Sequence, residues 1–218
     1  MRAVPTLLSR SQPRFVPAAV PARILAQARA NFFAQGYSGF KMDELAAELG
    51  LSKKTLYVHF ASKDEILRAT IEQLGHEIRA DADALLSDDM LTFAEKLRRF
   101  AEGMTQRLTL LNPRTVRDLQ RFAPDLHRLV EEMRQKNIPY IFGRFIAEGQ
   151  TAGMVRADLN RALAIEFFLQ AMQGLFQTAT LERLELAPRE VCAHAIDLFF
   201  GGLLTAAGRK EHEKLFSR

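Results

Sequence analysis

The sequence predicts an all-α protein, and two observations support this fold class. Apolar residues recur at helical spacing along nearly the whole chain after residue 20; Ile24, Ala28 and Phe32, for example, fall on one face of a helix. Valine and isoleucine are scattered, and no alternation of apolar and polar residues persists, so no β-strand is indicated. We therefore expect a chain built of about nine helices.

The helices are expected in the following order. The first contains Ile24 and ends at Gly36, because glycine tolerates the positive φ found just past a helix end. Pro139 lies inside an otherwise helical run and is expected to kink that helix or to break it in two. The other helices are expected at residues 42–49, 53–60, 63–86, 91–111, 114–122, 125–150, 160–183 and 189–207.

The composition is that of a globular protein with a substantial core. Hydrophobic residues make up 48% of the 218 residues and charged residues 26%, which excludes a disordered chain. A single cysteine excludes an internal disulfide and favours a reducing compartment, so a cytoplasmic protein is expected. No uncharged apolar run approaches the roughly 18 residues of a membrane-spanning helix, and no membrane contact is expected.

The positive charge is concentrated near the start of the chain. Residues 1–75 contain 10 Lys/Arg and 6 Asp/Glu, whereas the rest contains 20 of each, and the first acidic residue is Asp43. This excess favours an anionic partner such as nucleic acid. A targeting peptide would show the same bias. Prolines interrupt each short apolar run of residues 1–21, which argues against a secretory signal, whereas a transit peptide remains an alternative.

Two short helices are predicted around residues 43–49 and 53–60, separated only by Gly50, Leu51 and Ser52. So short a link holds two helices at a steep angle, as in a helix-turn-helix. Gly50 can adopt positive φ, and Ser52 is placed to cap the second helix with its hydroxyl group. The alternative, a helical pair that only packs, would not require a basic face on the second helix.

A second cap follows at once. Ser62, Lys63, Asp64 and Glu65 form a capping-box pattern in which Glu65 is expected to accept a hydrogen bond from the Ser62 N–H group. The cap fixes the start of the helix at 63–86 and brings Lys63 towards the same surface.

The stretch from Ile24 to Leu74 resembles the DNA-binding domain of TetR-type transcriptional regulators. The resemblance rests on the order and spacing of four segments, and beyond residue 80 it extends only to the helical layout. The segments are Phe33-Ala34-Gln35-Gly36-Tyr37, Met42-Asp43-Glu44-Leu45-Ala46, Gly50-Leu51-Ser52-Lys53-Lys54-Thr55-Leu56-Tyr57 and His59-Phe60-x-Ser62-Lys63.

The resemblance implies a set of DNA contacts. Lys53, Lys54 and Thr55 match the positions nearest the bases, at the start of the recognition helix. Ser52, at the exposed start of the same helix, is also expected to contact the DNA. Tyr57, His59 and Lys63 match positions that contact phosphates, and Lys41 would make an ionic phosphate contact where the family often has a hydroxyl group.

It also implies a domain organisation. We expect a flexible, basic, proline-rich arm at 1–20, a DNA-binding domain at 21–79 and a helical effector-binding and dimerisation domain at 80–218. Arg10 and Arg14 of the arm could enter a DNA minor groove, although plain disorder or a misassigned start explains the arm equally well.

Large apolar side chains in the second half suggest a pocket for a flexible, largely apolar ligand, although most of them must simply form the core. The expected lining residues are four apolar side chains and four polar ones that could anchor the ligand. They are Met104, Phe145, Phe168 and Met172, with Arg117, Arg121, Tyr140 and Gln173.

The last two predicted helices are apolar on more than one face, which exceeds the stripe of a surface helix and suggests a four-helix interface in a homodimer. The alternative is a monomer that buries both helices internally. The expected interface residues are Phe168, Leu175, Phe176, Ala179, Ile196, Phe199 and Leu203.

Other chemistry is not indicated. Cys192 is expected to be a buried thiol without a redox role, and the five histidines show no metal-ligand spacing. Signatures of enzymes and bound cofactors are absent. The predicted function is a homodimeric repressor that binds a palindromic operator and is released by a small molecule. A regulator without a ligand, an activator and, remotely, an enzyme remain alternatives.

Overall fold

The computed structural model describes residues 19–109 and 111–216, and this part of the chain confirms the all-α prediction. It contains eleven α-helices and no strand beyond an isolated bridge between Val155 and Leu204. The helices are α1 (Ala19–Gly39), α2 (Met42–Glu48), α3 (Lys53–His59), α4 (Lys63–Leu86), α5 (Phe93–Arg107), α6 (Pro113–Phe122), α7 (Pro124–Thr151), α8 (Arg161–Leu175), α9 (Thr178–Leu184), α10 (Pro188–Leu203) and α11 (Ala206–Phe216).

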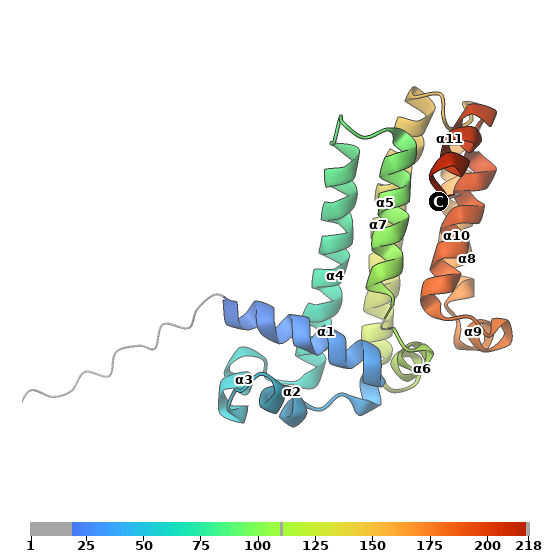
Figure 1. The fold of residues 1–218 in the computed structure, drawn as a ribbon. Helices are drawn as coiled ribbons and strands as arrows, with labels where there is room; N and C mark the ends of the chain where they lie inside the picture. Colours follow the sequence, from blue (N-terminus) through green and yellow to red (C-terminus); the bar gives the residue numbers. More distant parts are fainter. Residues whose placement is uncertain (1–18, 110, 217–218) are drawn as a thin grey trace, which may run out of the picture.

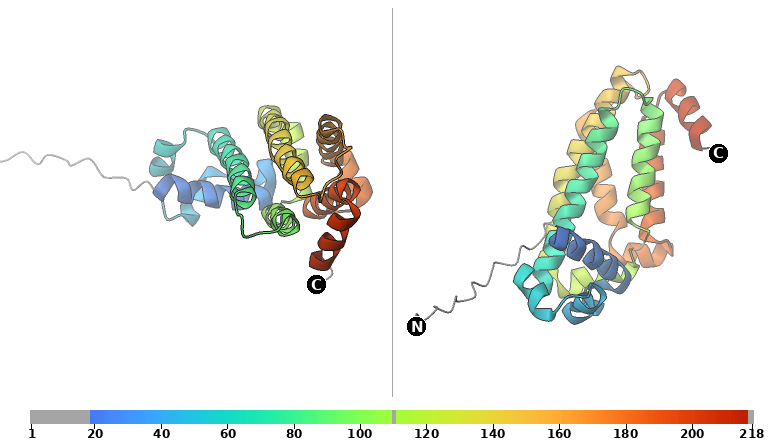
Figure 2. Two further views of the ribbon diagram at one scale, coloured as in Figure 1. Left: turned by 90° about the horizontal axis from the view of Figure 1, so that it is seen from above. Right: turned by 60° about the vertical axis from the view of Figure 1, so that its left-hand side comes forward.

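The helices form two groups. Helices α1, α2 and α3 gather at one end of the molecule, and α4 leads from them into a bundle with α5, α7, α8 and α10 (Figure 1). The α6 helix lies between the two groups, packed against α1, and α11 packs against α5 at the far end of the bundle (Figures 1 and 2).

Two hydrophobic clusters match these groups. The first comprises buried side chains of α4, α5, α7, α8 and α10, including Phe145 and Phe200. The second comprises buried side chains of α1 to α4, but it also takes Leu119 from α6 and Leu126 from α7. Helices α4 and α7 therefore belong to both clusters and join the two groups mechanically.

The first helix begins earlier than expected and is interrupted where expected. It starts at Ala19, and Pro21 falls in its first turn. The N–H groups of a first turn have no acceptor within the helix, so proline, which lacks an N–H group, is tolerated there. Gly36 interrupts the helix with φ 74° and ψ −178°, a backbone conformation almost confined to glycine. The predicted arm at 1–20, with Arg10 and Arg14, lies almost wholly outside the described residues.

Pro139 does not break its helix. The α7 helix continues from Pro124 to Thr151, so of the two expected outcomes, a kink or a break, the break does not occur. Ile138, Ile141 and Phe142 are buried on either side of the proline. Their packing against the neighbouring helices offsets the roughly 3 kcal/mol that an internal proline costs.

Two further boundaries raise the number of described helices above nine. The helix expected at 160–183 divides between α8 and α9 at Phe176 and Gln177. Leu204 turns to an extended conformation after α10, and the chain then starts α11, which was not predicted. Within the described residues, none of the helices combines the length and apolar character needed to cross a membrane.

Candidate nucleic-acid interface and ligand cavity

The turn between α2 and α3 has the predicted geometry. Gly50 adopts φ 65°, and the Leu51 N–H group donates to the Ala46 carbonyl at 2.9 Å. Leu45 and Leu56 are completely buried and hold the two helices against α1. The α3 helix therefore lies at the surface of this end of the molecule with one face packed and the other outward.

The predicted cap of α3 is also present. The Ser52 Oγ accepts a hydrogen bond from the Thr55 N–H group at 3.0 Å, and the two hydroxyl oxygens lie 2.8 Å apart. This pairing fixes the first turn of α3 and occupies the side chain of Thr55.

The basic residues near α3 differ in how they are held. Lys41 pairs with Glu44 at 2.7 Å and Lys53 with Asp43 at 2.6 Å. These pairs are solvent-exposed, so each contributes about 0–1 kcal/mol and can be exchanged for a phosphate. Lys54 is exposed and makes no ion pair or hydrogen bond within the described part of the chain.

Tyr57 and His59 lie further along α3 and differ in exposure. Tyr57 is 47% exposed, whereas His59 is half-buried. Both lie in the last turn of α3.

Lys63 is held inside the domain. Its Nζ donates to the Tyr37 carbonyl at 2.5 Å and lies 3.8 Å from the centre of the Tyr37 ring. Burial lowers the pKa of Lys63, which two nearby carboxylates partly oppose. The Tyr37 hydroxyl donates to Asp64 at 2.9 Å, and burial together with this carboxylate raises the pKa of Tyr37. Lys63 therefore joins the start of α4 to the last turn of α1, which the sequence did not indicate.

The second cap differs in one detail from the prediction. The Ser62 side chain accepts from the Glu65 N–H group at 3.1 Å, as expected. The Glu65 carboxylate, however, accepts from the Ala61 N–H group at 2.6 Å, one residue before the expected donor.

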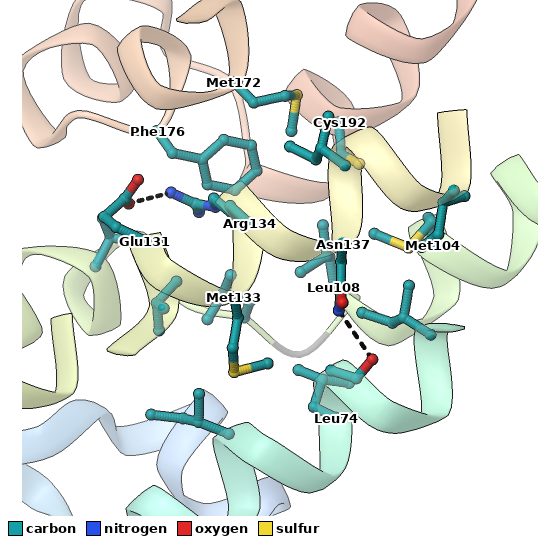
Figure 3. A pocket seen from close by; sticks show the side chains of 18 of the residues that line it. Leu74, Met104, Leu108, Glu131, Met133, Arg134, Asn137, Met172, Phe176 and Cys192 are labelled. Atoms are coloured by element: carbon teal, nitrogen blue, oxygen red, sulfur yellow. Dashed lines mark hydrogen bonds and ion pairs between the residues drawn. The ribbon is translucent and has the colours of Figure 1, made fainter. Parts of the chain in front are cut away.

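A cavity of about 220 Å³ lies where the two groups of helices meet (Figure 3). Its walls are almost entirely apolar and come from α1, α4, α5, α6, α7, α8 and α10. Of the predicted lining residues, Met104, Phe168 and Met172 face it, whereas Phe145 is buried in the core beside it.

The four predicted polar anchors do not line this cavity. Arg117 pairs with Glu182 on the surface, and Arg121 is exposed beside the Phe122 ring. The Tyr140 hydroxyl donates to Asp83 at 2.9 Å. Gln173 is exposed on α8. Sequence spacing placed them on the right helices but did not determine which way each side chain faces.

Other polar groups reach the cavity instead. Arg134 and Glu131 pair at 2.5 Å, and the Arg134 guanidinium lies 4.7 Å from the centre of the Phe176 ring. Burial lowers the pKa of Arg134. The Asn137 amide donates to the Gly75 carbonyl at 2.9 Å (Figure 3). These positions resemble ordinary i, i+3 surface pairs in the sequence, so no sequence signal distinguishes them.

The cavity borders the contact between α1 and α6. The Thr115 hydroxyl is completely buried and lies 3.3 and 3.2 Å from the carbonyl oxygens of Phe32 and Phe33, to which it donates. The Asn112 N–H group also donates to the Phe33 carbonyl, at 2.9 Å. Thr115, Phe32 and Phe33 all line the cavity, so a ligand bound in it would touch α1 directly.

The predicted dimer residues are mostly buried within the chain itself. Leu175 is half-buried and Ala179 is exposed on α9. Phe168, Phe176, Ile196, Phe199 and Leu203 belong to the core of the bundle.

The outer surfaces of α8 and α10 carry a different apolar set. Leu163 and Phe167 on α8 are 67% and 66% exposed, and Leu198 on α10 is 76% exposed. Gly174 and Gly201 lie on the same helices with open space where a Cβ atom would be. We call Leu163, Phe167 and Leu198 the outer apolar stripe.

Other site chemistry is limited. The Cys192 thiol is buried at the cavity wall, and burial raises its pKa to about 11. Within the described residues, no cluster of three or more histidine, cysteine or acidic side chains could hold a metal ion.

Known proteins are similar to this chain both in the sequence of the α1–α4 region and in the overall fold. Residues 24–70 match the family model of bacterial regulatory proteins of the tetR family. The uncharacterised HTH-type transcriptional regulator YvaF of Bacillus subtilis is 24% identical over 83% of this chain and 94% of its own length. The HTH-type transcriptional repressor DhaR of a Mycobacterium species is 23% identical over 70% of this chain and 78% of its own.

A solved structure supports the whole fold. A TetR family transcriptional regulator from Agrobacterium tumefaciens superimposes with a TM-score of 0.64, at 15% identity, over 87% of this chain and 100% of its own. The fold and the exposed α3 helix thus define a helix-turn-helix transcriptional regulator. More particularly, the match over residues 24–70 identifies the α1–α4 region as similar to the DNA-binding domain of the TetR family, and the whole chain has the fold of a TetR family regulator.

Proposed function

We propose that the protein is a homodimeric repressor. It binds an inverted-repeat operator through α3 and leaves this operator when a small, largely apolar molecule occupies the cavity. The observation that carries the proposal is the cavity's position, because one set of residues both lines it and connects the DNA-binding helices to the bundle. The family, and a relative named as a repressor, support the direction of control.

The proposed DNA-binding surface is the exposed side of α3 with Lys41 beside it. Lys54 is unpaired within the described residues, and the ion pairs of Lys41 and Lys53 are exposed and weak. Phosphate contacts of this kind release counterions, so each is expected to steepen the dependence of binding on salt. Ser52 and Thr55 fix the first turn and thereby the direction of the neighbouring lysines.

The proposed dimer interface is the outer apolar stripe. Large apolar side chains exposed on neighbouring helices favour burial against a second copy of the same stripe. The open space at Gly174 and Gly201 would permit close approach of the partner helices. A two-fold dimer would hold two α3 helices about 34–36 Å apart, one turn of DNA, which requires an operator with inverted symmetry. A cytoplasmic location is part of this proposal, since an operator would lie on chromosomal DNA.

The proposed ligand is compact and mostly apolar. A cavity of about 150 Å³ holds a benzene ring, so 220 Å³ suits a molecule slightly larger than a substituted ring. The partly buried polar groups at its wall already have partners: Arg134 pairs with Glu131, and Asn137 with the Gly75 carbonyl. An uncharged molecule leaves these pairs intact, and nothing in their arrangement calls for catalysis.

The proposed coupling passes through α6. A ligand that presses on Thr115 favours a geometry in which the hydroxyl no longer holds the Phe32 and Phe33 carbonyl oxygens. The position of α1, and with it α2 and α3, then shifts relative to the bundle. The ligand needs only to bind this second geometry more tightly than the first for the affinity for the operator to fall.

The test begins with DNA. Purified full-length protein is used to recover genomic DNA fragments at physiological salt, and the best fragments are footprinted. A protected inverted repeat is expected; weak binding without sequence preference would contradict operator recognition. An alkylbenzene series from toluene to butylbenzene is then titrated against the protein–operator complex. At least one member should raise the thermal midpoint of the free protein and weaken operator binding. If every member that raises the midpoint leaves operator binding unchanged, the ligand control is overturned.

A further inference from the structure

An apolar side chain lies in the middle of the surface that α3 presents to solvent. Val58 is 73% exposed, more than Tyr57 beside it, and belongs to neither hydrophobic cluster. No charge or hydroxyl group marks Val58 in the sequence, and the residues that the resemblance matches to DNA contacts lie on either side of it.

Helix geometry shows where Val58 faces. Leu56 is completely buried and marks the packed side of α3. Successive residues turn by about 100°, so Lys54 and Val58, two residues before and after Leu56, both lie about 160° from it. These two side chains therefore leave the helix directly opposite the core, whereas Lys53, Thr55 and Tyr57 leave from its flanks.

The flanking side chains are also less available. Lys53 is paired with Asp43 and Thr55 with Ser52. Lys54 and Val58 have no such partners within the described residues, so they are the side chains that α3 offers first to a docked duplex.

The chemistry of the major groove gives each of the two a distinct target. The one apolar group on a base-pair edge in the major groove is the 5-methyl group of thymine. Guanine presents two acceptors there, O6 and N7, which a lysine ammonium can bind. Four residues of helix rise about 6 Å, which corresponds to roughly two base-pair steps of 3.4 Å.

We propose that Lys54 and Val58 determine operator sequence as a pair: Val58 packs on a thymine methyl group, and Lys54 donates to a guanine about two base pairs away. The proposal rests on the proposed function, since it concerns the same DNA-binding surface. It predicts that each half-site contains a guanine and a thymine at this spacing.

The experiment uses base analogues that remove single groups from the DNA. Duplexes that bind the full-length protein are selected from a random library, and each thymine of the best duplex is replaced in turn by deoxyuridine, which lacks only the methyl group. At one thymine per half-site the affinity should fall about fourfold, the value for one buried methyl group. Replacing that thymine in both half-sites should cost about fifteenfold.

The matching protein change identifies the side chain responsible. Val58→Ala should bind the thymine duplex more weakly by a similar factor and should no longer distinguish thymine from deoxyuridine at the sensitive position. In the same way, Lys54→Met should lose the sensitivity to 7-deazaguanine, which lacks the N7 acceptor. Deoxyuridine outside the protected half-sites is the control for the DNA, and thermal unfolding of both variants is the control for the fold.

The possible outcomes distinguish failure of this proposal from failure of the proposed operator recognition. If no sequence is enriched, operator recognition itself fails. If a sequence is enriched but Val58→Ala still responds to deoxyuridine as the unaltered protein does, or no thymine is sensitive, the assignment of Val58 is overturned. If Lys54→Met keeps its response to 7-deazaguanine, the assignment of Lys54 is overturned.

Discussion

Two lysines of similar appearance in the sequence have different surroundings at the scale of single residues. Lys54 is exposed, whereas Lys63 is half-buried and donates to the Tyr37 carbonyl beneath it. The resemblance to TetR regulators matched both to DNA contacts. Spacing along the chain gives the helix on which a side chain lies, but not the partner that its charged end finds.

Substitution of each lysine by alanine should therefore have different effects. Lys63→Ala removes a charged hydrogen bond and a cation–π contact, and should lower the free energy of unfolding by about 1–3 kcal/mol. Lys54→Ala should change it by less than about 0.5 kcal/mol while weakening operator binding. Chemical denaturation and DNA titration of both variants measure the two effects. A Lys63→Ala protein as stable as the unaltered one would contradict the buried role of Lys63.

The Cys192 thiol makes stability depend on pH. Burial raises its pKa from 9.0 to about 11. Because the folded pKa lies above the unfolded one, the contribution is complete below about pH 9 and is lost as pH rises towards 11. A shift of this size corresponds to about 2–3 kcal/mol.

This dependence can be measured by difference. The free energy of unfolding of the unaltered protein should fall more steeply between pH 9 and 11 than that of Cys192→Ala, and the native thiol should resist iodoacetamide at pH 8. Parallel curves for the two proteins, or rapid alkylation at pH 8, would show that the thiol is not buried.

At the scale of elements, two glycines with positive φ separate the effect of backbone conformation from that of packing. Gly36 and Gly50 have φ 74° and 65°. A Cβ atom at Gly50 would meet nothing within 4 Å, whereas one at Gly36 would lie 2.9 Å from Asp118 Oδ2. Asp118 cannot easily withdraw, because it accepts from the Ser38 N–H group at 3.0 Å.

Gly50→Ala should therefore cost about 1–2 kcal/mol of unfolding free energy, the strain of the backbone alone. Gly36→Ala should cost roughly 1–2 kcal/mol more, since it adds a steric clash and disturbs the contact between α1 and α6. Chemical denaturation of the two variants provides the comparison. Equal losses would mean that Asp118 does not hold α6 against α1 at this point.

The elements also show what sequence reasoning could reach. Gly50 and Ser52 were predicted because a turn and a cap depend on neighbouring residues only, and both have the predicted geometry. The break between α8 and α9 and the continuous helix through Pro139 depend on packing between distant segments, which local patterns do not report. The cavity was anticipated by its methionine and phenylalanine content, but its polar wall at Glu131 and Arg134 was not.

At the scale of the whole molecule, dimer formation depends in our proposal on the outer apolar stripe. Phe167→Asp and Leu198→Asp introduce charges at positions 66% and 76% exposed in the single chain. Each substitution occurs twice in a two-fold interface. A loss of about 2 kcal/mol per copy would raise the dimer dissociation constant roughly a thousandfold.

Sedimentation velocity of the full chain tests this prediction. The two variants should sediment as folded monomers and should lose affinity for an inverted repeat. Met90→Asp, at a loop position that is 90% exposed, is the matched control and should leave the dimer intact. An unaltered protein that is monomeric at micromolar concentration, or variants that remain dimers, would refute this interface.

The contribution of α6 and α7 to the core of the DNA-binding helices determines whether these helices could be separated from the rest of the chain. The DNA-binding helices do not complete their own core, since Leu119, Ala123 and Leu126 come from beyond residue 110. A fragment ending after α4 would leave that side of α1 open to water, and a chimaera that joined it to another sensor would need a matching α6. The DNA-binding helices of this chain therefore cannot be transferred to another protein by themselves. They can be transferred only together with the helices that line the ligand cavity.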